Sequence, residues 1–360
     1  MAKMTIPIGP QHPLLKEPLS FLIGVEGEEV LSSSLRLGYV HRGIEKLAES
    51  RTFLQNVHLF ERVCGICSHI HTTTYCQGVE ALLELEVPSR GLYIRVLLCE
   101  FERIHSHLLW LGVLAKNIGL DTIFMYAWRD REIVLQMMEE ISGGRVSHAI
   151  NMIGGVRKDV SQAHIDSMLG KFPDLFDRVK ELNQVLEHDR TFQARTRGIG
   201  RLSLEEVKRY CVVGPVARAS GLDIDLRRDQ QYACYSDFSF DVPVMDEGDI
   251  WARSRIRLLE AVQSIGICRQ ILENIPDGEI ASTAARKVPP GEFLSRAEGP
   301  RGEVVYFIKS DGSQKPVRVK VRTPTMTALI TLPQQLKGMQ LADVSAIIAG
   351  VDLCIACADR

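Results

Sequence analysis

The sequence predicts a mainly helical protein with small antiparallel β pieces near both ends of the chain, an α+β arrangement. Two long stretches have apolar residues at helical spacing, and a hairpin signal lies on either side of them. Among 360 residues, 45% are hydrophobic and 24% are charged, as in an ordinary soluble chain with a sizeable core. This composition excludes disordered, collagen-like and coiled-coil proteins.

The first 40 residues are predicted to form a β region. Ser20–Val25 and Val30–Leu37 alternate around the turn-prone Glu26-Gly27-Glu28. Alternation with period two on both sides of such a turn is typical of an antiparallel hairpin.

Helical patterns begin at about Arg42. Ser89–Asn117 and Asp249–Asn274 each present an apolar stripe along one long helix. Two shorter helices are expected at Asp159–Leu169 and Leu175–Val185.

β structure returns near the C-terminus. Val304–Ile308 and Val317–Val321 lie on either side of a Ser-Asp-Gly-Ser turn, which predicts a second hairpin. The chain then ends in a short apolar segment, Ala342–Ile355. Without repeats or a clear linker, residues 1–360 are expected to form a single domain. Its parts are a β region (1–41), a helical body (42–299) and a hairpin with a C-terminal cysteine segment (300–360).

The charge balance excludes several kinds of partner. Lys and Arg number 43 and Asp and Glu 45, for a formal net charge of −2. A nearly neutral chain has no basic excess with which to bind nucleic acid or an anionic membrane. The longest apolar run, Leu108–Ala115, is far too short to span a bilayer, and no apolar signal core precedes the fold. Any membrane association is therefore expected to come through a partner.

Four of the nine cysteines form two C-x-x-C pairs, Cys64 with Cys67 and Cys354 with Cys357. Two-residue spacing lets both sulfurs of a pair converge on one metal, and soft thiolates select zinc, copper(I), iron or nickel. Zinc ribbons keep their pairs about 15–20 residues apart, whereas these pairs lie near opposite ends of the chain. A redox or catalytic metal site is favoured, and a structural zinc site stays open.

The other five cysteines are single. Cys99 and Cys268 fall within apolar helical patterns, where a buried inert thiol is expected. No ligand set is apparent near Cys76, Cys211 or Cys234.

The motifs around the cysteine pairs resemble the large subunit of nickel–iron hydrogenases. They read R-x-C-G-x-C-x-x-x-H at Arg62–His71 and D-x-C-x-x-C-x-x-R at Asp352–Arg360. Segments 9–13, 38–46 and 154–157 resemble the branch shared with the 49-kDa-type subunit of respiratory complex I. Together they point to the energy-converting, membrane-associated hydrogenases of the Ech-like or carbon-monoxide-linked type. Quinone-reactive relatives generally lack the four cysteines.

The resemblance implies a nickel–iron centre whose iron also binds cyanide and carbon monoxide. Cys64 and Cys354 would be terminal nickel ligands, and Cys67 and Cys357 would bridge the two metals. His71 falls where the family has a histidine that donates to a bridging thiolate.

The same resemblance implies a pocket for the small ligands of the iron. Pro300, Arg301, Pro324 and Thr325 match the family segments that form it. Thr325 would donate to a cyanide nitrogen, and Arg301 would lie above the open metal position. From residue type alone, these segments read as an ordinary loop and a strand-ending turn.

A second metal ion, magnesium or iron, is implied near the C-terminus, with Glu45 as a ligand. This sequence departs from the family pattern there, because Arg360 stands where many relatives have histidine. A protonated guanidinium cannot bind a metal ion. Leu353 replaces the usual proline, which removes no ligand.

Glu17 is the candidate for moving protons. The family has such a glutamate near the N-terminus, and Pro18 favours an extended conformation at Glu17. We expect Cys354 to accept the proton of cleaved dihydrogen first, with Arg301 as the competing acceptor. Glu17 would then relay it outward.

The expected function is reversible heterolytic cleavage of dihydrogen to protons, coupled to ion translocation. Electrons would leave through an iron–sulfur small subunit and a ferredoxin-like cluster subunit, with ferredoxin as the physiological partner. Antiporter-like membrane subunits would hold the chain on the cytoplasmic side of the membrane. The alternatives are a metal-free, complex I-like quinone-site or coupling subunit and a structural zinc protein.

Overall fold

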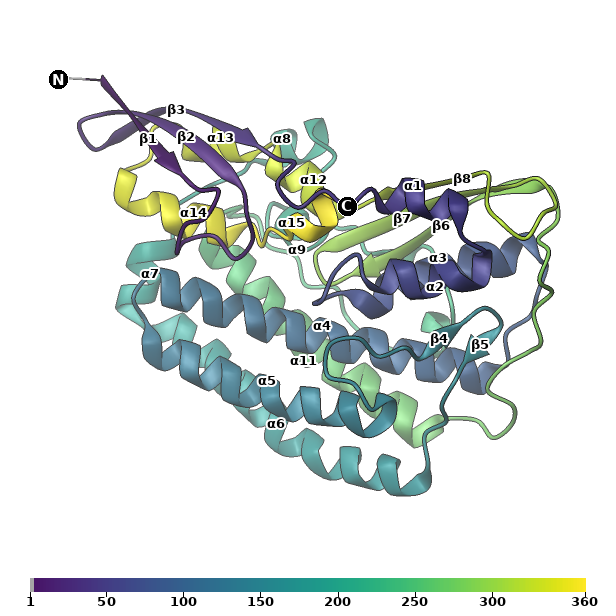
Figure 1. Ribbon diagram of the computed structural model, residues 1–360. Helices are drawn as coiled ribbons and strands as arrows, with labels where there is room; N and C mark the ends of the chain where they lie inside the picture. The colour runs from purple at the N-terminus through teal and green to yellow at the C-terminus, as the bar shows by residue number, and fades with distance from the viewer. Residues whose placement is uncertain (1–2) are drawn as a thin grey trace.

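In the computed structural model, which describes residues 3–360, two three-stranded sheets lie on one side of a bundle of four long helices (Figure 1). The long helices are α4 (Ser89–Asn117), α5 (Asp121–Ser142), α6 (Gln162–His188) and α11 (Ile250–Asn274). Helix α4 packs against α5 and α11, and α6 packs against the same two helices. Helix α4 is buried along most of its length, so it forms the centre of the core.

The two long helices expected from the sequence are confirmed. Helix α11 begins one residue later than expected because the Asp249 side chain caps it, accepting a hydrogen bond from the backbone N–H of Ala252. The expectation of two shorter helices was wrong, since α6 is one helix that contains Pro173. Phe172 and Leu175, on either side of the proline region, are buried against the core. Packing outweighs the local cost of proline there.

The N-terminal sheet has three antiparallel strands in the order β1 (Lys3–Ile8), β2 (Ser20–Glu26) and β3 (Glu29–Arg36). Strands β2 and β3 are the expected hairpin, with Gly27 at a positive φ of 63° in the turn. Strand β1 lies within residues 1–41, which were expected to form a β region, although no individual strand was assigned to residues 3–8. It is an edge strand and is mostly exposed.

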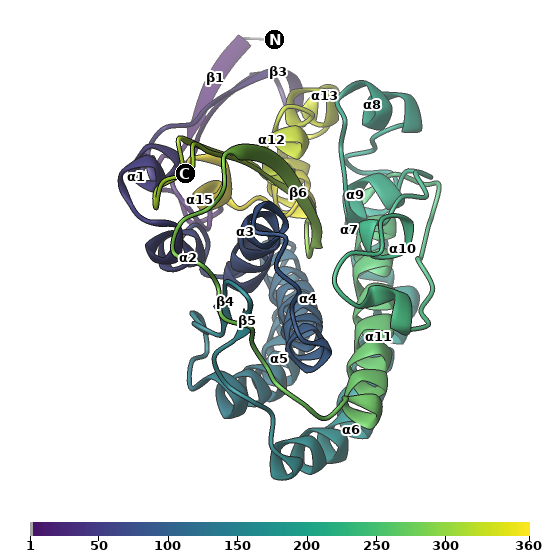
Figure 2. The ribbon, with the colours of Figure 1, turned by 90° about the vertical axis from the view of Figure 1, so that its right-hand side faces the viewer.

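The second sheet is also antiparallel, in the order β6 (Gly291–Gly299), β7 (Gly302–Ser310) and β8 (Arg318–Arg322). Strands β7 and β8 confirm the expected second hairpin. Strand β6 falls within residues 42–299, which were expected to be helical, so the expected helical body was wrong for residues 291–299. Figure 2 shows α3 (Ser68–Leu82) between this sheet and the long helices, in agreement with its contacts to β6, β7 and α4.

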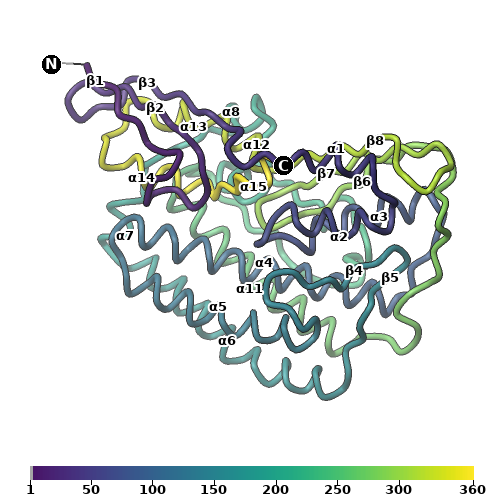
Figure 3. The backbone as a smooth tube through the Cα atoms, viewed as in Figure 1, coloured from purple at the N-terminus to yellow at the C-terminus, as the bar shows by residue number. Residues whose placement is uncertain are grey.

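The remaining elements are short. The helices are α1 (Ile44–Ser50), α2 (Phe53–Glu61), α7 (Arg190–Thr196), α8 (Leu204–Arg209), α9 (Pro215–Arg218), α10 (Leu226–Asp229), α12 (Pro324–Leu329), α13 (Leu332–Leu336), α14 (Val344–Gly350) and α15 (Ile355–Ala358). The others are β4 (Asn151–Met152), β5 (Gly155–Val156) and 3-10 turns at Tyr235–Asp237 and Leu341–Asp343. The backbone trace places α15 between the two sheets, beside α12 (Figure 3). The last turn of the chain is therefore enclosed by the rest of the fold.

Candidate metal centre

The fold brings the two cysteine pairs into one buried cluster. Cys64 and Cys67 lie on the turn between α2 and α3, while Cys354 and Cys357 lie at and within α15. The Sγ atoms of Cys64 and Cys354 are 3.3 Å apart, and those of Cys67 and Cys357 are 3.5 Å apart. None of the four residues is more than 5% exposed. Each sulfur thus faces one from the opposite end of the chain.

The electrostatics of this cluster fit a metal centre. Hydrogen bonds from Cys354, Cys357 and Cys67 lower the pKa of Cys64 well below its ordinary value. The interaction with Cys354 instead raises the pKa of Cys67 and of Cys357 far above theirs, and burial adds to this. Cys67 and Cys357 therefore resist ionisation in the absence of a cation. Four buried thiolates require metal cations to balance their charge.

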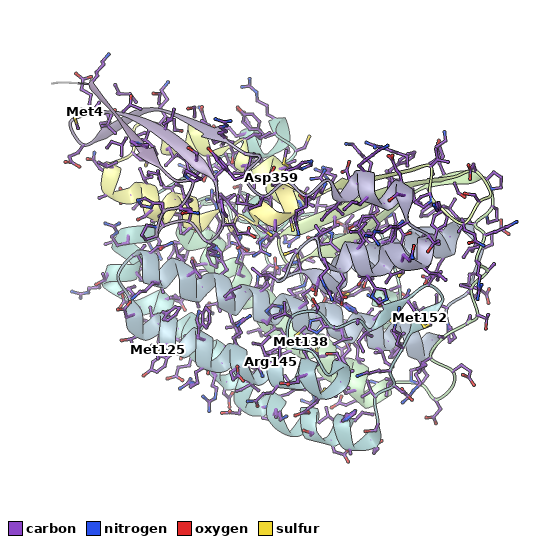
Figure 4. All side chains as sticks on the ribbon, in the orientation of Figure 1. Met4, Met125, Met138, Arg145, Met152 and Asp359 are labelled. Carbon is purple, nitrogen blue, oxygen red and sulfur yellow. The ribbon has the colours of Figure 1, made fainter. Side chains whose placement is uncertain are left out.

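Residues of the segment 38–42 hold the C-terminal turn in place. The Asp359 carboxylate accepts hydrogen bonds from the backbone N–H groups of Gly38 at 2.8 Å and Val40 at 2.9 Å. Asp359 lies where the chain end meets the N-terminal part of the molecule (Figure 4). The Arg42 guanidinium donates to the carbonyl oxygens of Val63 at 2.9 Å and Ala356 at 3.0 Å. Arg42 therefore joins the two cysteine segments directly, a role that sequence reasoning missed.

Glu17 lies beside the second cysteine pair. Its Oε2 accepts hydrogen bonds from the backbone N–H of Ile355 and, at 3.1 Å, from that of Ala356. Ile355 and Ala356 separate Cys354 from Cys357, so the carboxylate lies against the backbone between the two ligand cysteines. The neighbouring Lys16 ammonium lies 3.8 Å from the Asp352 carboxylate.

His71 on α3 contacts Cys357 of the cluster. Its Nε2 lies 3.5 Å from the Cys357 Sγ, and its Nδ1 lies 2.8 Å from the Tyr306 hydroxyl oxygen. Burial lowers the pKa of His71 to about 4, so the ring is neutral near pH 7. Burial also raises the pKa of Tyr306 well above its ordinary value, so the phenol keeps its proton. Tyr306 carried no signal in the sequence.

A small cavity of about 10 Å³ lies against the thiols and has room for about one water-sized group. It is lined by Cys67, Ile70, His71, Gly299, Pro300, Arg301, Val304, Pro324, Thr325 and Cys357. The four pocket residues expected from the sequence are thus brought together. The Thr325 Oγ1 accepts a hydrogen bond from the Cys354 N–H at 3.3 Å, which leaves its own proton free to donate.

Arg301 is held rigidly above this cavity by Asp352. Its Nε donates to the Asp352 carbonyl oxygen at 3.1 Å and its Nη2 to Asp352 Oδ1 at 3.0 Å. Burial raises the pKa of Asp352, but the charges of Arg301, Lys16 and Arg257 together hold it below its ordinary value. The remaining nitrogen of Arg301, Nη1, is buried and has no hydrogen-bond partner among the described residues. One donor of a buried guanidinium is therefore available to a ligand of the centre.

Together these observations fit a nickel–iron centre. The donor set is four soft thiolates, and Arg301 and Thr325 line the small cavity that adjoins them.

The surroundings of Glu45 do not fit a second metal ion. Its carboxylate accepts hydrogen bonds at 3.0 Å from the Val321 N–H, the Lys320 ammonium and the Arg360 guanidinium. These groups hold the pKa of Glu45 below its ordinary value, although burial opposes them. Arg318 lies 3.7 Å away as a further cation. A divalent metal ion at Glu45 would face the positive side chains of Lys320, Arg360 and Arg318. We therefore assign no role to a metal ion at Glu45.

Cys99 and Cys268 are buried within α4 and α11, as expected for inert core thiols. Three histidines outside the proposed ligand set, His69, His105 and His107, are also buried. His69 and His105 each face a backbone carbonyl, and the His107 Nε2 lies 2.9 Å from the Glu260 carboxylate.

Two protein families match this chain. The profile of the respiratory-chain NADH dehydrogenase 49 Kd subunit matches residues 117–287 and 281–360, and that of the nickel-dependent hydrogenases matches residues 42–172. The hydrogenase match thus includes the first cysteine pair, and the NADH dehydrogenase match includes the second.

Individual relatives align along the whole chain. A carbon monoxide-induced hydrogenase of Rhodospirillum rubrum is 38% identical over 361 residues, covering 100% of both chains. An NADH-quinone oxidoreductase chain of Koribacter versatilis is 36% identical, covering 99% of this chain and 96% of that one.

Among solved structures, a chain of the membrane-bound sulfane sulfur reductase, an archaeal respiratory membrane complex, is similar with a TM-score of 0.95. It is 32% identical, and the alignment covers 99% of this chain and 98% of that one. The chain therefore belongs to the large-subunit family that includes the 49-kDa subunit of the respiratory-chain NADH dehydrogenase and membrane-associated hydrogenases.

Proposed function

We propose that this chain is the catalytic subunit of an energy-converting nickel–iron hydrogenase. The observation that carries the proposal is the pairing of four buried sulfurs from opposite ends of the chain beside a cavity lined by Arg301 and His71. When bound, the nickel–iron centre supplies the reversible heterolytic cleavage of dihydrogen. The protein's own residues hold the metals, exclude water and move the proton.

The cysteines would divide into terminal and bridging ligands. Cys64 and Cys354 would bind nickel, and Cys67 and Cys357 would bridge nickel and iron. The 3.5 Å approach of His71 to Cys357 supports this division, because a bridging thiolate then has a hydrogen-bond donor of its own. Pro300, Pro324 and Thr325 would enclose the cyanide and carbon monoxide ligands of the iron.

Arg301 and Glu17 would have different tasks at the centre. Asp352 fixes two donors of the Arg301 guanidinium, so its third donor is preorganised towards the cavity. Cys354 would accept the proton released from dihydrogen. Glu17, hydrogen-bonded one and two residues beyond Cys354, would pass that proton towards solvent or a membrane partner.

Electrons would leave through partner subunits. The described cysteines outside the cluster are single residues with no second pair among them, so they offer no iron–sulfur relay. An iron–sulfur small subunit would receive the electrons and exchange them with a ferredoxin-like cluster subunit. None of the helices within residues 3–360 has the length and apolar character needed to cross a bilayer. Antiporter-like membrane subunits would anchor the chain on the cytoplasmic side and couple the reaction to ion translocation.

The second candidate is a metal-free quinone-site or coupling subunit. It is favoured by the match to the NADH dehydrogenase 49 Kd subunit over residues 117–287 and 281–360. A metal-free subunit has no use for four convergent thiols, so the metal content of the protein separates the two functions.

Replacing Cys357 by serine tests the proposal. A bridging thiolate binds two metals and serine is a harder, far less acidic ligand, so Cys357→Ser should abolish nickel incorporation and hydrogenase activity. Cys99→Ser is the matched control, because Cys99 is equally buried but contacts Thr73 rather than the cluster. If purified Cys357→Ser protein keeps normal nickel and activity, the ligand assignment is wrong.

A further inference from the structure

The His71 ring lies between a ligand thiol and a single buried hydroxyl. Its Nε2 faces the Cys357 Sγ, and its Nδ1 lies 2.8 Å from the Tyr306 hydroxyl oxygen. Both His71 and Tyr306 have an exposed fraction of 0%. Within residues 3–360, His71 is the one hydrogen-bond partner found for the Tyr306 hydroxyl. The Tyr306 hydroxyl therefore forms its hydrogen bond with His71 alone among the described residues.

The position of this hydroxyl is fixed by packing. Tyr306 lies on the central strand β7, opposite Ser295 of β6 and Val321 of β8. Its ring makes an edge contact with Phe60 at a centroid distance of 5.0 Å and with Tyr75 at 6.2 Å. A ring enclosed by two strands and two aromatic rings cannot swing away from His71 without disturbing the core.

The contact indicates which ring nitrogen of His71 bears the proton, because the Tyr306 hydroxyl has no other acceptor among the described residues. A phenol has one proton to donate, and a neutral imidazole has one donor and one acceptor nitrogen. If the Tyr306 hydroxyl donates to Nδ1, the imidazole proton must be on Nε2, and Nε2 points at the Cys357 sulfur. This arrangement turns His71 into a donor to a metal-ligating thiolate.

We propose that Tyr306 is a positioning residue that fixes the tautomer of His71, so that Nε2–H donates a hydrogen bond to Cys357. This inference rests on the proposed nickel–iron centre. The donated hydrogen bond withdraws electron density from a bridging sulfur and hence from both metals. Tyr306 therefore tunes the centre without touching it.

Tyr306→Phe is the direct test, with Tyr75→Phe as the matched control. Both variants remove one buried hydroxyl from the same aromatic cluster, but the Tyr75 hydroxyl donates to the Phe53 carbonyl at 3.1 Å and does not contact His71. The measurement is the infrared spectrum of the carbon monoxide and cyanide ligands in the purified complex. In Tyr306→Phe the carbon monoxide band should move to lower frequency, because a more electron-rich iron donates more strongly to that ligand. In Tyr75→Phe the bands should coincide with those of the wild type.

A second substitution covers the case in which Tyr306→Phe fails to assemble. Site-specific replacement of Tyr306 by 3-fluorotyrosine keeps the ring and hydroxyl but makes the phenol a stronger donor. The carbon monoxide band should then move to higher frequency, opposite to the shift in Tyr306→Phe.

Unchanged bands in either Tyr306 variant, or shifts of the same sign in both, would overturn the positioning role while leaving the proposed function intact. A wild-type complex that lacks carbon monoxide and cyanide bands would instead overturn the proposed function, and this inference with it.

Discussion

Replacing Arg301 by lysine separates the charge of this residue from its geometry. The guanidinium donates two hydrogen bonds to Asp352 at 3.0 and 3.1 Å, and its Nη1 has no partner within residues 3–360, while the residue lines the cavity. A lysine ammonium keeps the positive charge but places all its donors on one atom. It cannot hold Asp352 in two places and still present a fixed donor to the cavity.

The size of the effect follows from the donor that is lost. A preorganised donor aimed at developing charge in a buried site contributes about 3–4 kcal/mol to catalysis. Its loss lowers activity by roughly a hundredfold to a thousandfold. Asp352 also loses one of its two charge-assisted hydrogen bonds, which costs about 1.5–3 kcal/mol of folding stability. The metals should be retained, because no ligand changes.

The assay is hydrogen-dependent dye reduction by the intact complex, expressed per nickel. Arg95→Lys is the matched control, since Arg95 is equally buried and forms a two-point pair with Glu80 at 2.5 and 2.8 Å, away from the cavity. Arg95→Lys should lower the melting temperature but keep activity per nickel. If Arg301→Lys stays within about threefold of the wild type, roughly 0.7 kcal/mol, Arg301 does not act at the centre.

Three further predictions follow from the site and its surroundings. Glu17→Gln keeps a side-chain oxygen that can accept both backbone N–H groups but cannot carry a proton. The enzymatic exchange of deuterium gas with solvent protons should therefore fall at least about a hundredfold, near 2.7 kcal/mol, with nickel retained. The control is Glu28→Gln at the hairpin tip, which should exchange at the wild-type rate. A wild-type exchange rate in Glu17→Gln would exclude this relay. The wild-type melting temperature should be unaffected by EDTA, and Arg360→His should be less stable than the wild type because it loses the guanidinium contacts to the Glu45 carboxylate and the Val321 carbonyl. A wild-type melting temperature that drops with EDTA would show that a metal ion is bound there. Burial lowers the pKa of His69 to about 3 and of His107 to about 4. Below about pH 6.5 these two histidines bind protons in the unfolded chain but stay neutral in the folded protein. The free energy of unfolding should therefore fall by about 1.4 kcal/mol per pH unit for each ring as the pH is lowered to about 4. A melting temperature that stays constant or rises as the pH is lowered from about 6.5 to about 4 would contradict these pKa values.

Elements with strong periodicity could be predicted from the sequence, and elements formed by tertiary packing could not. The apolar stripe of α4 correctly predicted where this helix begins and ends, at Ser89 and Asn117. The break expected between residues 169 and 175 is absent, because contacts of α6 with α5 and α11 outweigh the effect of Pro173. Strand β6 is exposed over its first four residues and buried over its last three, so it has no alternating pattern.

At the site, residues that share a short motif were predicted, and their supporting partners were not. Cys64, Cys67 and His71 stand within one ten-residue segment, so one pattern includes them all. Tyr306 and Arg42 reach the cluster from distant segments, through a strand register and a loop. A single sequence carries no record of such pairings, since they depend on how the sheets and helices stack.

Metal analysis of the wild-type complex, combined with infrared spectroscopy, tests the central claim most directly. The four paired sulfurs and the small cavity beside them predict nickel and iron bound to this subunit, with carbon monoxide and cyanide stretching bands from the iron. Equimolar zinc without such bands would instead identify a structural zinc site. A metal-free subunit without bands would identify a quinone-site or coupling protein, and either result would contradict the proposed hydrogenase.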